Sequence, residues 1–357
     1  MICHVGWRAL RFARVAVLAL GAWLAAPVVV TADPPQQPVP PALREFGFDA
    51  QQHRALATGA IVTADVRTAM HKELMGSVAM RLPIPPADLA HRIRSGINVM
   101  ADPKMSAYAP IDRAGDALAW RGVVCSTAEV GEARALAETE PGTDFNLSTA
   151  EWAAVRAHFA GVRISSDDEV LAVASDIWRD VLAGRFRSYR DHGPAGLAGY
   201  DRGASTSLPG DEIRQGDSAP YVPSSLAAFV RAIDRFPALP PGIDSRFFWK
   251  KTEIDDRPAF VLAHVLVEER ADGVRFALRE FYVSHTYNVL QQLGLVLPTP
   301  DGGSIVLAIN STITDRLPGM FTSLARSIGE RRSRAALEDY FASIRRAIGA
   351  DTPLSGG

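Results

Sequence analysis

The chain has 357 residues, of which 47% are hydrophobic and 22% charged, and its formal net charge is −2 at neutral pH. This mildly acidic balance gives no electrostatic reason to bind nucleic acid, so that function class is excluded. The length and hydrophobic content are enough for one large domain or two smaller ones.

The first 32 residues have the pattern of an export signal. Three arginines precede an uncharged run from Val15 to Val30, and small residues follow as far as Ala32. The run is shorter than the roughly 20 residues that a helix needs to cross a bilayer, and Pro27 interrupts it. We therefore expect cleavage after Ala32 rather than an uncleaved anchor. The mature chain would be periplasmic or secreted, would have no transmembrane segment, and would carry a net charge of −5 without the three arginines.

Residues 33–45 are rich in proline and poor in core-forming side chains. This composition predicts a disordered linker between the cleavage site and the body of the protein. Residues 46–350 are predicted to form a single α+β domain, and residues 351–357 a disordered tail.

Cys125 is the single cysteine of the predicted mature chain, because Cys3 would leave with the signal. No internal disulfide is then available, although an exported protein could keep one. A partly buried thiol without a chemical role is the simpler interpretation, and a nucleophile is the alternative.

Two extended segments, residues 60–66 and 74–82, are expected to open the domain. The prolines of PIPP after the second segment suit a helix start, and Leu89, Ile93 and Ile97 then share one helical face. Residues 102–142 show little pattern and are expected to form loops and short helices.

A helical insertion is predicted over about residues 115–236. Ser148, followed three residues later by Glu151, has the spacing of a capping box at a helix start. A second helix, ending near Tyr189, begins with acidic residues and ends with arginines, which suits the helix dipole. A short helix over residues 224–236 is stopped by prolines.

The clearest pattern lies in the last hundred residues. Residues 258–269 and 274–283 read as a hairpin around Asp272-Gly273, and residues 286–297 and 304–313 extend it as further strands. A long helix is expected from Pro318 to about Ile348, and it must bury its apolar stripe against the sheet. The stripe consists of Phe321, Leu324, Ile328, Leu337, Phe341, Ile344 and Ile348.

The segment from His158 to Ile348 resembles an uncharacterised family of exported bacterial proteins. The resemblance is carried by SYRDHGPAGLAGYDRG, RFFWKK, AHVLVEE, EFYVSHTYNVLQQLGL and AINSTITDRLPGMFTSLARSIGERR, in this order. It agrees with export and implies no particular activity.

The order of elements also resembles the helix-grip fold of the START and polyketide-cyclase-like superfamily. The resemblance rests on PIPPADLAHRIRS after a strand and on the four closing strands before one terminal helix. It implies a curved antiparallel sheet that wraps around the helix and commonly holds a hydrophobic ligand between the two layers. The helical insertion departs from the simple pattern of that superfamily.

Polar residues concentrate at the end of the second hairpin strand, over residues 279–288. Because strand side chains alternate between faces, we expect Glu280 and Tyr282 on one face and Arg279 on the other. A buried charge needs a partner, so these residues would contact a ligand if their face lines a cavity. Solvated charges on an edge strand, or an internal Arg-Glu pair, are the alternatives.

His285 is expected where this strand turns over, with Tyr282 and Tyr287 nearby. It could serve as a general base or a metal ligand, or it could be a hydrogen-bonded turn residue. His264 is interpreted as a satisfied core histidine. It could approach His285 across adjacent strands, but the spacing has no ligand signature, so neither a metal nor a cofactor is predicted. Asn310, near the end of the last strand, is a further ligand contact or has a local structural role.

The leading hypothesis is an exported protein that binds a hydrophobic or lipid-like small molecule between the sheet and the C-terminal helix. The predicted ligand contacts are Arg279, Glu280, Tyr282, His285, Tyr287, His264 and Asn310. A hydrolase or isomerase that uses His285 with Tyr282, Glu280 or Arg279 is the first alternative. A structural or partner-binding protein of the cell envelope is the second, and no particular protein partner is indicated.

Overall fold

The computed structural model describes residues 39–66, 68, 70–316 and 323–349, with side chains of the last helix described from Arg334 onward. The predicted export signal, residues 33–38 of the linker, the helix start at Pro318 and the tail after residue 350 lie outside these ranges. Phe321 of the predicted apolar stripe lies outside them too, and the side chains of Leu324 and Ile328 are not described.

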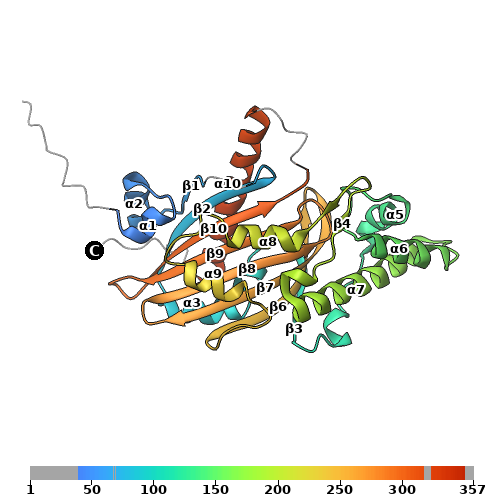
Figure 1. The fold of residues 1–357 in the computed structure, drawn as a ribbon, viewed down its shortest axis with the longest axis horizontal. Helices are drawn as coiled ribbons and strands as arrows, with labels where there is room; N and C mark the ends of the chain where they lie inside the picture. The colour runs from blue at the N-terminus through green and yellow to red at the C-terminus, as the bar shows by residue number, and fades with distance from the viewer. Residues whose placement is uncertain (1–38, 67, 69, 317–322, 350–357) are drawn as a thin grey trace, which may run out of the picture. The chain divides into compact units, whose positions relative to one another are not determined.

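Within the described residues, the fold is α+β and is built on a curved antiparallel sheet of eight strands (Figure 1). The strand order is β1-β2-β10-β9-β8-β7-β6-β3, and every neighbouring pair is antiparallel. The strands are β1 (Val62–Ala64), β2 (Glu73–Leu82), β3 (Met105–Ile111), β6 (Ile243–Ile254), β7 (Arg257–Arg270), β8 (Gly273–Val283), β9 (Val289–Pro298) and β10 (Ser304–Ile313). A separate pair joins β4 (Tyr200–Asp201) to β5 (Thr206–Ser207).

Three helices cover what we call the inner face of the sheet. They are α3 (Pro86–Arg94), α4 (Ile97–Met100) and the long C-terminal helix α10 (Ser323–Ala347). Leu337, Phe341 and Ile344 of α10 belong to the same buried cluster as Phe276 and Val306 of the sheet. The predicted helix-grip-like packing of the C-terminal helix against the sheet is therefore confirmed.

The insertion covers the opposite, outer face. It runs from residue 112 to 242, between β3 and β6, and α8 and α9 lie over the sheet in Figure 1 while α3 lies behind it. Trp178 of α7 packs on Phe260 of β7, with ring centroids 5.8 Å apart. The insertion contains η1 (Ala117–Trp120), η2 (Thr127–Glu129), α5 (Val130–Glu138), α6 (Thr149–Ala160), α7 (Asp167–His192), η3 (Gly193–Gly196), α8 (Pro209–Asp217) and α9 (Ala227–Ile233).

The sequence-based prediction of a linker through residue 45 is wrong at its end. Residues Pro41–Glu45 form helix α1, and Leu43 is buried in the outer-face core. Helix α2 (Ala50–Ala57) follows, with Asp49 and Gln52 forming a capping box at its start. The prolines of this segment thus lead into a helix, where a missing N–H costs nothing.

Two strands of the eight-stranded sheet were not predicted, and neither was the short pair of β4 and β5. β3 lies in the stretch expected to be loops, and β6 precedes the hairpin where the clear pattern was thought to begin. The capping box of Ser148 and Glu151 at the start of α6 is confirmed, as is the hairpin of β7 and β8.

Candidate functional site

A β-bulge in β8 divides the predicted polar cluster between the two faces of the sheet. Leu262 of β7 pairs with Tyr282, whereas its neighbour Ala263 pairs with Glu280, so Phe281 is an extra residue. Glu280 therefore stays on the inner face, while Phe281 and Tyr282 both belong to the outer-face core. The expectation that Tyr282 shares a face with Glu280 is wrong, because the bulge shifts the alternation.

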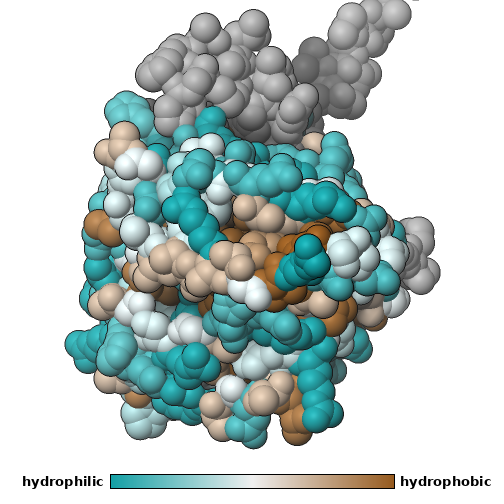
Figure 2. Space-filling model, turned by 90° about the vertical axis from the view of Figure 1, so that its right-hand side faces the viewer, coloured by the Kyte–Doolittle hydropathy of each residue, from teal (hydrophilic) through white to brown (hydrophobic). Residues whose placement is uncertain are grey.

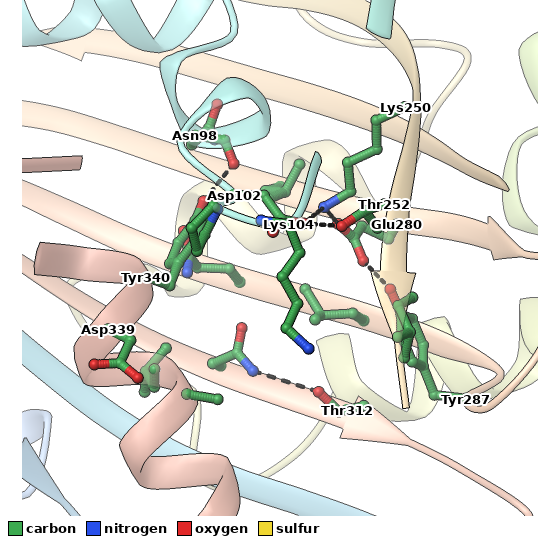
Figure 3. A pocket seen from close by; sticks show the side chains of 18 residues that line it. Asn98, Asp102, Lys104, Lys250, Thr252, Glu280, Tyr287, Thr312, Asp339 and Tyr340 are labelled. Carbon is green, nitrogen blue, oxygen red and sulfur yellow. Dashed lines mark hydrogen bonds and ion pairs between the residues drawn. The ribbon is translucent and has the colours of Figure 1, made fainter. Parts of the chain in front are cut away.

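A cavity of about 370 Å³ opens on the inner face beside Glu280. Its floor is formed by β6, β8, β9 and β10, and its sides by α10 and the loop after α4 (Figure 3). The volume falls in the range of pockets that hold small ligands. The apolar part of its wall consists of Pro103, Ile254, Leu278, Leu290, Ala336 and Leu337.

A buried ionic cluster occupies one side of the cavity. Lys250 Nζ lies 2.8 Å from Glu280 Oε1 and 3.2 Å from Asp102 Oδ2. The hydroxyl of Tyr287 donates to Glu280 Oε2, and that of Thr252 donates to Asp102 Oδ2 at 2.8 Å. Figure 3 shows these side chains converging; Lys250 and Thr252 come from β6, Glu280 from β8, and Asp102 and Tyr287 from the loops after α4 and β8. Lys250 and Glu280 are 6% and 3% exposed, so water screens this cluster little.

The charges in this cluster stabilise one another. Burial by itself would lower the pKa of Lys250, but the carboxylates of Glu280 and Asp102 raise it above its ordinary value. Burial likewise opposes ionisation of Asp102, yet Lys250 brings the pKa of that carboxyl below its usual value. Burial and then the charge of Glu280 raise the pKa of Tyr287 well above its ordinary value, which keeps the phenol protonated as a donor.

Asn98 and Gln292 form the wall between this cavity and a deeper void of about 20 Å³ under α3 and α10. Both side chains are buried, at 3% and 2% exposure. Both polar atoms of the Asn98 side chain, and Gln292 Oε1, lack a hydrogen-bond partner among the described residues. The hydroxyl of Tyr340 reaches only the backbone carbonyl of Asn98.

Arg279 belongs to the outer face, beneath the insertion. Its guanidinium donates to Asp217 of α8, to Gln291 Oε1 at 2.8 Å and to the carbonyl of Ile233 at 3.2 Å. Burial raises the pKa of Asp217, although the charge of Arg279 opposes this. Arg279 thus joins the insertion to the sheet and does not line the cavity.

His264 is a satisfied core histidine, as expected. Its ring nitrogens lie 3.0 Å from the Tyr189 hydroxyl and 2.8 Å from the Ser245 hydroxyl, and the side chain has no exposed surface. Burial, and then the charge of Arg279, holds its pKa well below the ordinary value. Tyr282 is buried nearby on the same face, under the guanidinium of Arg185 at 4.5 Å from its ring centroid.

His285 is a hydrogen-bonded turn residue. Its Nε2 donates to the carbonyl of Pro258 at 3.0 Å, and its Nδ1 accepts from the Thr286 hydroxyl at 2.6 Å. Burial lowers its pKa to about 4, helped by the charge of Arg257. The ring nitrogens of His264 and His285 are all engaged by other groups, so the two histidines do not form a pair of free metal ligands.

Of the seven predicted contacts, the structure places Glu280, Tyr287 and Asn310 at the cavity. The proposed catalytic group is not assembled, because Arg279 and Tyr282 face the outer layer while Glu280 faces the inner one.

Sequence reasoning missed Lys250, Asp102, Asn98 and Gln292. For two of them a signal existed. Lys250 shares a strand face with Phe248, and Gln292 shares one with Leu290, so each is a polar residue in an apolar row. The criterion of a polar residue among apolar neighbours on one strand face identifies Glu280 in β8. Applied to β6 and β9, it also identifies Lys250 and Gln292.

No group of three or more histidine, cysteine or carboxylate side chains in residues 39–66, 70–316 and 334–349 is placed to hold a metal ion. Among the described helices, none has the length and apolar character to cross a bilayer. Cys125 is a free thiol whose pKa burial raises to about 11, so the thiolate nucleophile is disfavoured there.

No protein-family model matches the chain, and no curated protein matches it in sequence. Among solved structures it is similar to one titled "Crystal structure of Ara h 8.0201", with 13% identity and a TM-score of 0.20. That match covers 31% of this chain and 68% of the other. A likeness this weak carries no argument about the fold or the function.

Proposed function

We propose that this protein binds a small molecule with an apolar body in the cavity between the sheet and α10. The observation that carries the proposal is the cavity of about 370 Å³ at Leu278, Leu290 and Leu337, in a layer that is otherwise closely packed. The volume and the mostly apolar wall of this cavity are those of pockets that hold small ligands, and this supports an occupant.

The polar groups support the same proposal. Ligand pockets are mostly apolar and hold a few convergent polar groups that fix the orientation of the ligand. Here the Lys250–Glu280–Asp102 cluster lies on one side and aliphatic side chains lie on the other. This division fits a molecule with one polar end.

The test is a titration with Nile red, an uncharged dye that fluoresces in apolar surroundings. We expect saturable binding to the wild-type chain. Leu290→Trp narrows the cavity and should weaken binding by about ten-fold or more. Leu118→Trp adds the same side chain at a position that is 62% exposed and should leave binding unchanged. Equal binding to all three proteins would contradict the proposal.

We infer that the protein performs this function outside the cytoplasm, after cleavage at Ala32. The support is the leader pattern of residues 1–32. Expression of the full chain in a Gram-negative host, followed by osmotic release and N-terminal sequencing, should yield a periplasmic protein that begins at Asp33. Uncleaved chain in the cytoplasm would contradict the inference.

Partner binding at the surface has less support. The large hydrophobic side chains that are exposed among the described residues are Tyr108, Leu118, Val124, Val162 and Leu208. Figure 2 shows hydrophobic residues gathered near the middle of one face, among hydrophilic ones. Apolar side chains are an ordinary part of the surface of a folded protein, so this gathering does not by itself define a partner.

A further inference from the structure

The charges that line the cavity already satisfy one another. Lys250 is shared by two carboxylates, Glu280 at 2.8 Å and Asp102 at 3.2 Å. The remaining oxygens of these carboxylates accept from the Tyr287 hydroxyl and from the Lys104 backbone N–H at 3.0 Å. The buried cation is therefore paired with two carboxylates, and these outnumber it in the cluster.

An anionic ligand would find an unfavourable site here. A third carboxylate could not approach Lys250 without also approaching Glu280 and Asp102, and the low exposure of the cluster leaves that repulsion weakly screened. The side chain of Lys104 does not change this balance, because it pairs with Glu253 at 2.9 Å. Asp339, on the α10 side of the cavity, adds another negative charge.

The uncommitted polar atoms beside the cavity are uncharged. Asn98 supplies a donor and an acceptor, and Gln292 supplies an acceptor, all without a partner in the described chain. Buried polar atoms are nearly always hydrogen-bonded in native proteins. An uncharged group that both donates and accepts would satisfy them, at a lower desolvation cost than an ion.

We propose that the polar end of the ligand is uncharged and both donates and accepts hydrogen bonds, as a primary amide or a hydroxyl does, and that the cavity rejects carboxylates. This inference rests on the proposed function, since it presumes that the cavity binds an apolar molecule. It assigns Asn98 and Gln292 to the ligand head, and Glu280 and Asp102 to the exclusion of anions.

The test is displacement of Nile red at neutral pH by octanamide, octanol, octanoate and octylamine, which share one chain length. Octanamide and octanol should displace the dye at concentrations about ten-fold or more below that of octanoate. Glu280→Gln removes one carboxylate beside Lys250 and should tighten octanoate binding by about ten-fold, with little change for octanamide. Such a gain of affinity cannot result from misfolding. Glu140→Gln makes the same charge change at a side chain that is 80% exposed and should alter nothing.

Failure of the uncharged-head inference and failure of the proposed function give different results in this displacement experiment. If Nile red binds and octanoate displaces it as well as octanamide does, the exclusion of anions is wrong while the cavity remains a binding site. Stronger displacement by octylamine than by octanamide would likewise overturn the uncharged head, because the ligand would then be a cation facing the carboxylates. If Nile red fails to bind at all, the proposed function itself fails.

Discussion

Arg279 has no exposed surface, and its charge is balanced by Asp217 from the insertion. Such a pair contributes little when intact, because burying both ions costs about as much as their attraction returns. Removing only one partner of the pair affects the free energy of unfolding much more, because the other charge stays buried. An isolated carboxylate beneath the insertion would be left without a counter-charge.

We therefore predict that Arg279→Met lowers the free energy of unfolding by about 3 to 5 kcal/mol. The double variant Arg279→Met/Asp217→Leu should recover most of that loss, because no buried charge is left over. Urea denaturation measures both values. Arg270→Met, at an arginine side chain that is 58% exposed, is the control and should cost little. A double variant as unstable as the single one would contradict this account.

His285 predicts a pH dependence of stability. Burial holds its pKa at about 4 in the folded chain, against 6.5 for an unperturbed histidine. Between these values the unfolded chain binds more protons, so the free energy of unfolding falls as the pH decreases from 6.5 to 4. The contribution of this residue reaches about 3 kcal/mol at the acid end. The pKa of His264 is also lowered in the folded chain, so this histidine likewise makes the free energy of unfolding fall as the pH decreases.

The measurement is urea denaturation across this pH range for the wild type and for His285→Gln. The variant should show a shallower decline, since glutamine does not titrate. Parallel pH profiles would show that the histidine is not buried as described.

At the scale of the element, the strands explain both the success and the failure of sequence reasoning. The hairpin of β7 and β8 could be predicted because its turn residues and strand lengths are local properties. β6 was missed because Phe247, Phe248 and Trp249 form a continuous apolar run, which is typical of a strand covered on both faces. Alternation, the main strand signal, is then lost.

For the candidate site too, sequence patterns predict local features but not contacts between distant segments. Glu280 could be predicted from its apolar neighbours on one strand face. Lys250 and Asp102 could not be linked to it, because they come from β6 and from the loop after α4, and only the fold brings them together. The bulge at Phe281 could not be predicted either, since it depends on the partner strand β7.

Two glycines in different elements should respond in opposite ways to replacement by alanine. In β9, a Cβ at Gly294 would lie 2.1 Å from the ring of Phe276, so the ring must move. In α7, a Cβ at Gly184 would meet nothing within 4 Å. We expect Gly294→Ala to destabilise the protein by about 1 to 3 kcal/mol, and Gly184→Ala to stabilise it by up to about 1 kcal/mol. Thermal denaturation of both variants tests the pair, and the same sign of change in both would contradict the packing described.

At the scale of the whole molecule, the sheet carries a helical layer on each face, and the two layers differ in how they are filled. The outer layer is a packed core in which Arg279 and His264 have their partners. The inner layer is packed under α3 but opens into the cavity toward the start of β9 and the end of β10. We infer that the outer layer stabilises the sheet, while the inner layer is free to serve binding.

This division is tested most directly by native mass spectrometry of the protein purified from a bacterial host, with organic extraction of whatever is bound. The account predicts an uncharged apolar molecule, at no more than one per chain, that is retained by Leu118→Trp and lost from Leu290→Trp. Identical bound mass in both variants, or none in the wild type even after incubation with octanamide, would contradict a binding cavity between the sheet and α10.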